Sequence, residues 1–157
     1  MWWRRERADW ARGQGVGNRR AFREVVRKGD PPGLIAYVDG EPAGWVALAP
    51  REVYPRLARS RTLKPIDEKP VWSVTCFFVA RPNRRQGLTV RLLEAAADFA
   101  KKRGATILEG YPIEPGSGPM ADAWVFTGVA AAFRRAGFRE AARPSKTRPI
   151  MRRTLRA

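Results

Sequence analysis

The sequence lacks histidine altogether and has a single cysteine, Cys76, among its 157 residues. One cysteine cannot form an internal disulfide, and a chain without histidine cannot build the Cys–His pair of thiol hydrolases. The commonest zinc ligands are missing for the same reason, so we expect no metal cofactor. A chain without disulfides is typical of a reducing compartment, and we expect a cytoplasmic protein in which Cys76 is a buried, inert thiol.

Long apolar runs are also missing. No stretch of about 18 or more apolar residues occurs, so the sequence contains no candidate for a membrane-spanning helix. The first ten residues, MWWRRERADW, lack the apolar core of a signal peptide. We therefore expect no membrane partner.

Acidic residues are few. Against 31 lysines and arginines there are 15 aspartates and glutamates, which gives a net charge of +16. Such a charge attracts anions, including nucleic acids and polyphosphate ligands. The basic residues are spread along the chain, so a solvated arginine-rich surface is an equally good interpretation. Nucleic acid is disfavoured as a partner, because we find no recognition-helix motif and no aromatic platform on a predicted strand.

The apolar pattern predicts one mixed α/β (α+β) domain with a single sheet over residues 1–157, divided into an N-terminal helical part (1–33) and a sheet core (34–157). Asn18 is the expected N-cap of the first helix, and Asp39-Gly40 the expected turn of a hairpin. The expected helices span residues 18–28, 88–103 and 124–136; the expected strands span 34–38, 43–49, 71–80, 105–111, 138–142 and 148–155. Residues 50–70 and 112–119 are expected to be loops, and the first of these is either functional or a plain surface insertion.

A strand, a basic turn and an amphipathic helix follow one another from Val71 to Arg103. The turn reads RPNRRQG and ends at Gly87, immediately before the helix. Backbone N–H groups at a helix start have no partner within the helix and can bind an anion. The same pattern fits a basic turn that caps an ordinary strand–helix unit, so the turn alone does not decide between these interpretations.

Two motifs make the chain resemble the GNAT superfamily of N-acetyltransferases. The segment Arg84-Arg85-Gln86-Gly87-Leu88-Thr89 is similar to the acetyl-CoA loop R/Q-x-x-G-x-G/A, with Thr89 in place of the last small residue. The segment Phe133–Phe138 is similar to the aromatic-x-x-x-Gly-Phe ending of the last helix of the family. The resemblance covers residues 34–155, and the PRE…Y…R segment after the hairpin resembles bacterial members. It implies direct transfer of an acetyl group from acetyl-CoA to an amine of a small molecule or a peptide.

The resemblance also implies where the cofactor binds. The pyrophosphate would lie on the backbone N–H groups of residues 86–89, with charge supplied by Arg84 and Arg85. The pantetheine arm would pair with the end of the central strand, between two diverging strands. The implied cofactor-binding residues are Phe77, Phe78, Val79, Arg84, Arg85, Gln86, Gly87, Leu88 and Thr89.

The usual catalytic groups of the family do not occur at the matching positions. The proton-donating tyrosine of the last helix is replaced by Phe133, and the central strand carries Ser73 and Thr75 but no carboxylate. We predict Glu109 as a substitute base and Tyr111 as a substitute proton donor. A carboxylate paired with arginine and a packed aromatic ring are the competing interpretations. The missing groups motivate an alternative function, a catalytically weak acetyl-CoA sensor.

The family fold usually begins with a strand, and residues 1–17 contain no clear one. Either Met1-Trp2-Trp3 forms a short strand, or this strand is missing and the sheet edge is covered in another way. Formation of a homodimer is one such way. The N-terminal tryptophans fit an interface and a core equally well.

Overall fold

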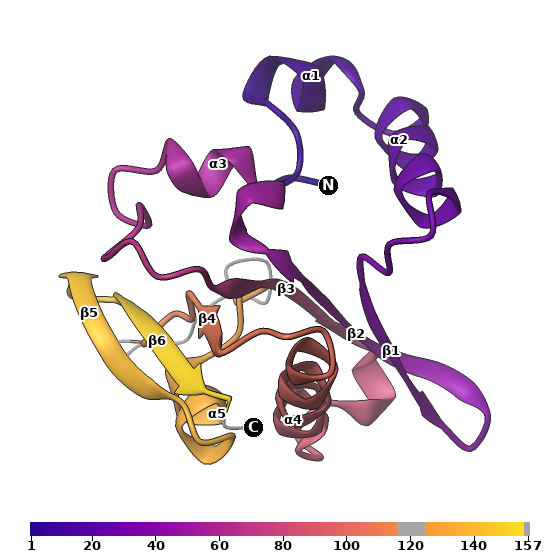
Figure 1. The fold of residues 1–157 in the computed structure, drawn as a ribbon. Coiled ribbons are helices and arrows are strands. Elements are labelled where there is room, and N and C mark those ends of the chain that lie inside the picture. Colours follow the sequence, from indigo (N-terminus) through magenta and orange to yellow (C-terminus); the bar gives the residue numbers. More distant parts are fainter. Residues whose placement is uncertain (116–124, 156–157) are drawn as a thin grey trace.

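The centre of the protein is a single six-stranded mixed sheet. The computed structural model describes residues 1–115 and 125–155 (Figure 1). The strand order is β1-β2-β3-β4-β6-β5, with β3 and β4 parallel and the other neighbours antiparallel. The strands are β1 (Gly33–Val38), β2 (Glu41–Pro50), β3 (Trp72–Val79), β4 (Ile107–Gly110), β5 (Arg139–Ser145) and β6 (Arg148–Thr154). This arrangement confirms the predicted mixed α/β fold.

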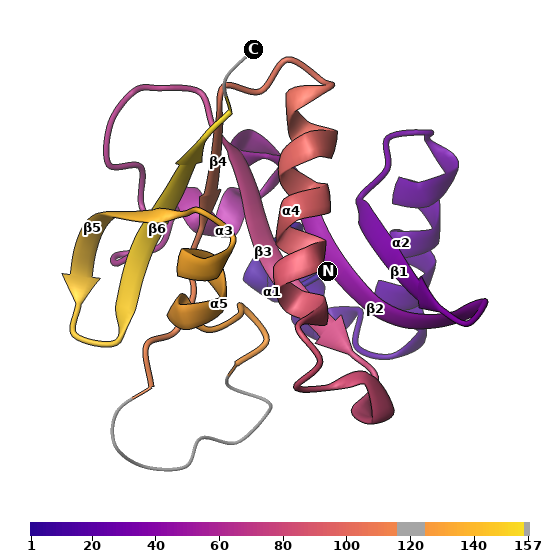
Figure 2. The ribbon, with the colours of Figure 1, turned by 90° about the horizontal axis from the view of Figure 1, so that it is seen from below.

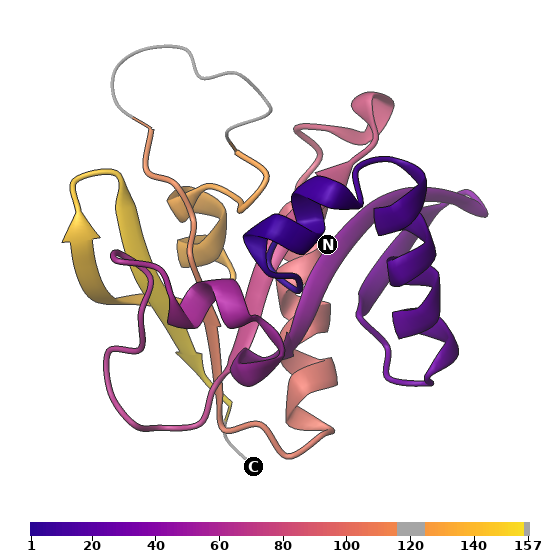
Figure 3. The same ribbon diagram turned by 90° about the horizontal axis from the view of Figure 1, so that it is seen from above.

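Helices cover both faces of the sheet (Figures 1 and 3). On one face lie α1 (Arg7–Arg12), α2 (Val16–Arg27) and α3 (Pro55–Ala58); on the other lie α4 (Leu88–Lys101) and α5 (Ala130–Arg135). Two short 3-10 turns, η1 (Arg51–Val53) and η2 (Arg81–Asn83), follow β2 and β3. The larger core lies under α4 and α5, and a smaller one around Tyr54 and Tyr111 lies on the opposite face. None of the described helices is long and apolar enough to cross a membrane.

The sheet begins with the β1–β2 hairpin. Asp39 and Gly40 form its turn, and both have positive φ angles, of 50° and 82°, as a tight two-residue turn requires. Residues 1–32, all of which the structure describes, contain no strand. Of the two alternatives for the N-terminus, the one without a first strand is therefore correct, and β1 is the outer strand.

Two sequence predictions about helices are wrong, and two short helices were not predicted. The predicted helix over residues 124–136 is wrong in extent: α5 starts only at Ala130, because Gly128 has a φ of 86° that no right-handed helix accepts. Trp124 and residues 116–119 of the predicted loop lie outside the described residues. Asn18 is not an N-cap, since α2 begins at Val16 after Gly15. The Asn18 side-chain amide instead donates to the carbonyl of Trp10 at 2.8 Å, and the short helices α1 and α3 were not predicted.

Candidate functional site

The parallel strands β3 and β4 diverge halfway along β3. Ala47 lies opposite Cys76 and Leu48 opposite Val74, which leaves Thr75 as an extra residue on β3. Such a bulge bends its strand and ends regular pairing. Accordingly, β4 pairs only with residues 72–74 of β3, and Figure 2 shows the two strands separating toward the start of α4. The second half of β3 is therefore an open edge beside α4.

The open edge makes backbone hydrogen bonds to groups outside the sheet. The N–H of Phe77 donates to the carbonyl of Phe126 at 2.6 Å. The carbonyl of Val79 accepts a hydrogen bond from Nε of Arg84 at 3.1 Å, and that of Thr75 accepts one from Nε1 of Trp3, also at 3.1 Å. These backbone groups are the ones that a peptide-like ligand would use if it were added as a strand.

The turn between η2 and α4 has the backbone shape of an anion site. Arg85 and Gly87 both adopt positive φ angles, of 62° and 77°, and Gly87 is the N-cap of the 14-residue helix α4. The left-handed conformation explains the glycine, because an L side chain there costs about 1–2 kcal/mol. The N–H groups of Leu88 and Thr89 lie in the first turn, where backbone donors have no acceptor within the helix.

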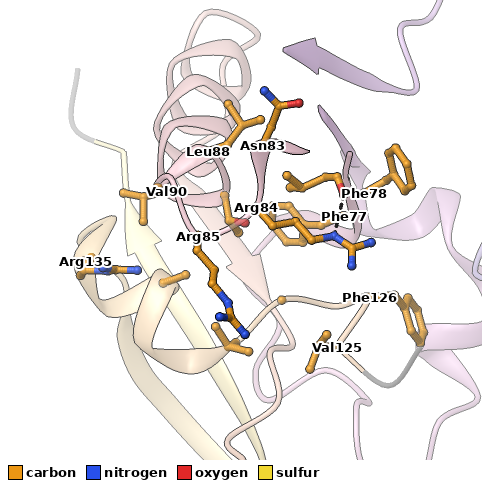
Figure 4. A pocket seen from close by; sticks show the side chains of 16 residues that line it. Phe77, Phe78, Asn83, Arg84, Arg85, Leu88, Val90, Val125, Phe126 and Arg135 are labelled. Carbon is orange, nitrogen blue, oxygen red and sulfur yellow. Dashed lines mark hydrogen bonds between the residues drawn. The ribbon is translucent and has the colours of Figure 1, made fainter. Parts of the chain in front are cut away.

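A cavity of about 520 Å³ joins this turn to the open edge of β3 (Figure 4). Its described lining includes three arginines, Arg84, Arg85 and Arg135, and no acidic residue. Among the predicted cofactor residues, those that line it are Phe77, Phe78, Val79, Arg84, Arg85, Gly87, Leu88 and Thr89. Gln86 does not line it; its Nε2 atom donates to the carbonyl of Pro82 at 2.9 Å.

The far wall of this cavity was not predicted from the sequence. Val125, Phe126, Gly128 and Val129 form a turn there that was predicted as helix, and Arg135 of α5 follows. The positive φ of Gly128 and the bridge between Ile113 and Val129 hold the turn in place. The isolated glycine within an apolar run was the one signal in the sequence for such a turn.

Phe133 is not a wall of the cavity. Its ring is fully buried and packs edge to face against Phe77 and Phe138, at centroid distances of 6.0 and 4.9 Å. A Cβ on Gly110 would lie 2.1 Å from the Phe133 ring, so the glycine makes room for it. The residue at the position of the family's tyrosine is thus a core residue.

Glu109 and Tyr111 lie together in a buried polar cluster. The Glu109 carboxylate is 1% exposed and accepts hydrogen bonds from Arg51, Arg152 and the Tyr111 hydroxyl, at 2.7, 2.7 and 2.6 Å. Ser73 also lies within 2.7 Å of that hydroxyl, and Arg152 continues to Asp67. The cluster ties the 50–70 connection to β4 and β6.

Neither Glu109 nor Tyr111 lines the cavity. Burial, with the Glu109 charge as a second cause, raises the pKa of Tyr111 well above its usual range, so the phenol keeps its proton. Both Glu109 oxygens already accept hydrogen bonds from neighbours in the cluster. The roles of Glu109 as base and of Tyr111 as proton donor stay predictions. The competing interpretation for Glu109 was a carboxylate paired with arginine, and its ion pairs with Arg51 and Arg152 are present.

A second cavity, of about 550 Å³, is lined by residues of the N-terminal segment, α2, β2 and β3. Half of its described lining is aromatic and includes Trp3, Phe22 and Trp45. Phe78 and Phe126 line both cavities, so these two rings stand between them. The sequence did not predict this cavity, because its residues come from segments far apart in the chain.

The sequence matches one known family. A model of the acetyltransferase (GNAT) family matches residues 2–112, well over half of the chain. The chain belongs to the GNAT family. The match starts at residue 2, so the GNAT model also covers the N-terminal helices that the motif resemblance left out. No curated protein matches the chain.

Solved structures of acetyltransferases share the GNAT fold. One described as ribosomal-protein-alanine N-acetyltransferase from Brucella melitensis is 20% identical, with a TM-score of 0.58 over 90% of this chain and 79% of that one. A GNAT acetyltransferase from Streptococcus pneumoniae is 13% identical, with a TM-score of 0.55 over 90% and 78%. The aminoglycoside acetyltransferase AAC(6')-Ib, solved with coenzyme A, is 18% identical, with a TM-score of 0.52 over 76% and 64%. At these identities the likeness establishes the fold.

Proposed function

We propose that the protein transfers the acetyl group of acetyl-CoA to an amine. The observation that carries this proposal is the first cavity, which connects a cationic turn at a helix N-terminus with the half of β3 that has no pairing to β4. A coenzyme A molecule has both matching parts, since its phosphates are anionic and its pantetheine arm contains amide groups.

In this proposal, each part of the site binds one part of coenzyme A. Arg84 and Arg85 neutralise the phosphates, and the N–H groups of residues 87–89 donate to the pyrophosphate. The pantetheine amides pair with the β3 edge at Phe77 and Val79. That pairing requires the Phe126 carbonyl and Nε of Arg84 to leave their present backbone partners. Cofactor binding is therefore coupled to a shift of the turn at residues 125–128.

The chemistry needs no covalent enzyme intermediate. The neutral amine nitrogen attacks the thioester carbonyl, the new C–N bond forms, the C–S bond breaks, and coenzyme A leaves as the thiol while the amine loses a proton. Water can relay that proton from the amine to the departing sulfur, and holding the two reactants in line supplies much of the rate.

A second candidate function is an acetyl-CoA sensor. One observation favours it: no described residue that lines either cavity is acidic, so neither contains an evident carboxylate base. A sensor needs the same cofactor site but no acceptor.

Transfer can be tested with acetyl-CoA that carries an isotopic label in its acetyl group. The protein is incubated with a panel of amines that contains amino acids, peptides, polyamines and aminoglycosides, and the mass of each amine is measured. We expect one labelled acetyl group on at least one amine, with an equal amount of released coenzyme A. A thiol reagent can follow that release, after subtraction of one equivalent for Cys76, the only thiol of the chain.

If acetyl-CoA binds but neither product appears for any amine, the sensor function replaces the transferase. Heat-unfolded protein is the control for spontaneous hydrolysis and acetylation.

A further inference from the structure

We propose that the second cavity binds a small aromatic amine that carries an anionic group, and that this molecule is the acetyl acceptor. An aromatic α-amino acid is the simplest compound of this class. The acceptor role rests on the proposed function, whereas binding to the cavity does not.

The walls of the cavity are suited to a flat apolar ring. Trp3, Phe22 and Trp45 come from the N-terminal segment, α2 and β2, and the last two rings pack edge to face at 6.0 Å. The Trp3 indole is fixed by its hydrogen bond to the carbonyl of Thr75. A volume of about 550 Å³ lies within the range of small-molecule sites, which are typically apolar with a few polar groups.

One side chain that lines this cavity, that of Phe78, is large and apolar but exposed to solvent. Phe78 is 59% exposed although it follows the buried Phe77 on the central strand. A ligand ring placed in the second cavity would cover part of Phe78 and gain the free energy of apolar burial. Core packing does not account for this exposure.

The positive charges that line the cavity favour a ligand with a negatively charged group. Arg4 and Arg19 are its charged side chains, and neither forms an ion pair with a residue that the structure describes. Arg4 is held in position by hydrogen bonds to the Pro32 carbonyl and the Tyr54 hydroxyl, both at 3.2 Å. Guanidinium groups match a carboxylate with two parallel hydrogen bonds. A polyamine would instead meet two unpaired positive charges and no described acidic residue.

The location of the cavity brings the amine to the acetyl group. Phe78 and Phe126 border both cavities, and the Phe77 N–H, which we assign to the cofactor side, lies on the strand between them. A ligand whose ring packs on Trp45 and whose carboxylate faces Arg19 has its amine within the same cavity. The amine can then reach a thioester at the border once the turn at 125–128 has shifted.

Binding can be measured without acetyl-CoA. Cys76, expected to be buried and inert, is instead half-buried, lines the second cavity and is the only thiol. A bound ligand should therefore slow its alkylation by iodoacetamide, detected as a single mass shift. Burial raises the pKa of Cys76, so the reaction is run at alkaline pH. The four probes are L-phenylalanine, phenethylamine without the carboxylate, L-alanine without the ring, and spermidine. We expect protection at the lowest concentration with L-phenylalanine, at about tenfold higher concentration with phenethylamine, and none with the other two.

A variant pair assigns the charge recognition. Arg19→Gln should weaken protection by L-phenylalanine about tenfold and leave phenethylamine unchanged. Arg20→Gln is the matched control, because Arg20 is the exposed neighbour on α2 and does not line the cavity. Equal effects of the two variants would overturn the assignment of Arg19.

The acceptor role is tested by adding labelled acetyl-CoA to the same four amines. N-acetyl-L-phenylalanine should form fastest. Preferential binding or acetylation of spermidine, or absence of protection by L-phenylalanine up to millimolar concentration, would overturn the inference while leaving the transferase function intact. Protection without any acetyl-CoA binding would support the cavity as a ligand site and contradict the transferase.

Discussion

Replacing Glu109 with alanine is expected to lower the free energy of unfolding by about 3–5 kcal/mol, because it leaves two buried cations without their shared anion. Arg51 and Arg152 bind opposite oxygens of this carboxylate at 2.7 Å, and their side chains are only 12% and 14% exposed. For a domain of this size the midpoint of thermal unfolding should fall by about 6–20 °C. Thermal and urea unfolding, followed by circular dichroism, measure the change.

Glu24 provides the matched control. Its carboxylate pairs with Arg27 on the exposed face of α2, with 53% of the glutamate side chain in solvent, so Glu24→Ala should change stability by less than about 1 kcal/mol. A change as small as this for Glu109→Ala would contradict the structural role of the cluster. Glu109→Gln keeps an acceptor for the Tyr111 hydroxyl and should be less destabilising. If that variant stays folded and loses acetyl transfer, the predicted base role gains support.

Replacing Arg85 with glycine is expected to weaken acetyl-CoA binding about 10- to 100-fold without a loss of stability. Arg85 lines the first cavity, and a charge-assisted hydrogen bond to a phosphate contributes about 1.5–3 kcal/mol. Its φ of 62° is strained for arginine and relaxed for glycine, which offsets the larger entropy of an unfolded glycine. This variant should therefore bind acetyl-CoA more weakly at unchanged stability, whereas replacement of a purely structural residue would lower both affinity and stability. Titration calorimetry and thermal unfolding measure the two effects.

Arg81→Ala is the control for Arg85. Arg81 is an exposed cation in the same connection and does not line the cavity, so its replacement should leave the affinity within about twofold. The difference between wild-type protein and Arg85→Gly should shrink at high salt, since part of the interaction is electrostatic. Wild-type affinity for acetyl-CoA in the Arg85→Gly protein would contradict the assignment of the phosphates to Arg85.

Local signals in the sequence predicted the features that depend on neighbouring residues. The Asp39-Gly40 turn, the apolar strand β3 and the glycine before α4 are each specified by a few consecutive residues, and the structure confirms them. The loop before α4 is also specified locally, and eight of the nine residues predicted to bind the cofactor line one cavity; their binding role stays a prediction. Gln86 differs because its side chain finds a nearer acceptor in Pro82.

Features built from distant segments were not predictable in the same way. Glu109 receives its partners from 58 residues before it and 43 residues after it, and no spacing rule connects them. The second cavity likewise joins the N-terminus to β2, β3 and the turn at Phe126. The extent of α5 depended on one glycine, because the positive φ of Gly128 separates the turn before it from the helix that begins at Ala130.

Titration of acetyl-CoA into the protein tests the central claim most directly, namely that the cavity between β3 and the start of α4 is the cofactor site. The proposal predicts one saturable site per chain, an affinity that falls with salt, and a weaker site in Arg85→Gly. Adenosine triphosphate should bind more weakly, because it lacks the pantetheine arm that pairs with the β3 edge. Absence of heat and of any thermal stabilisation at millimolar acetyl-CoA would contradict the claim.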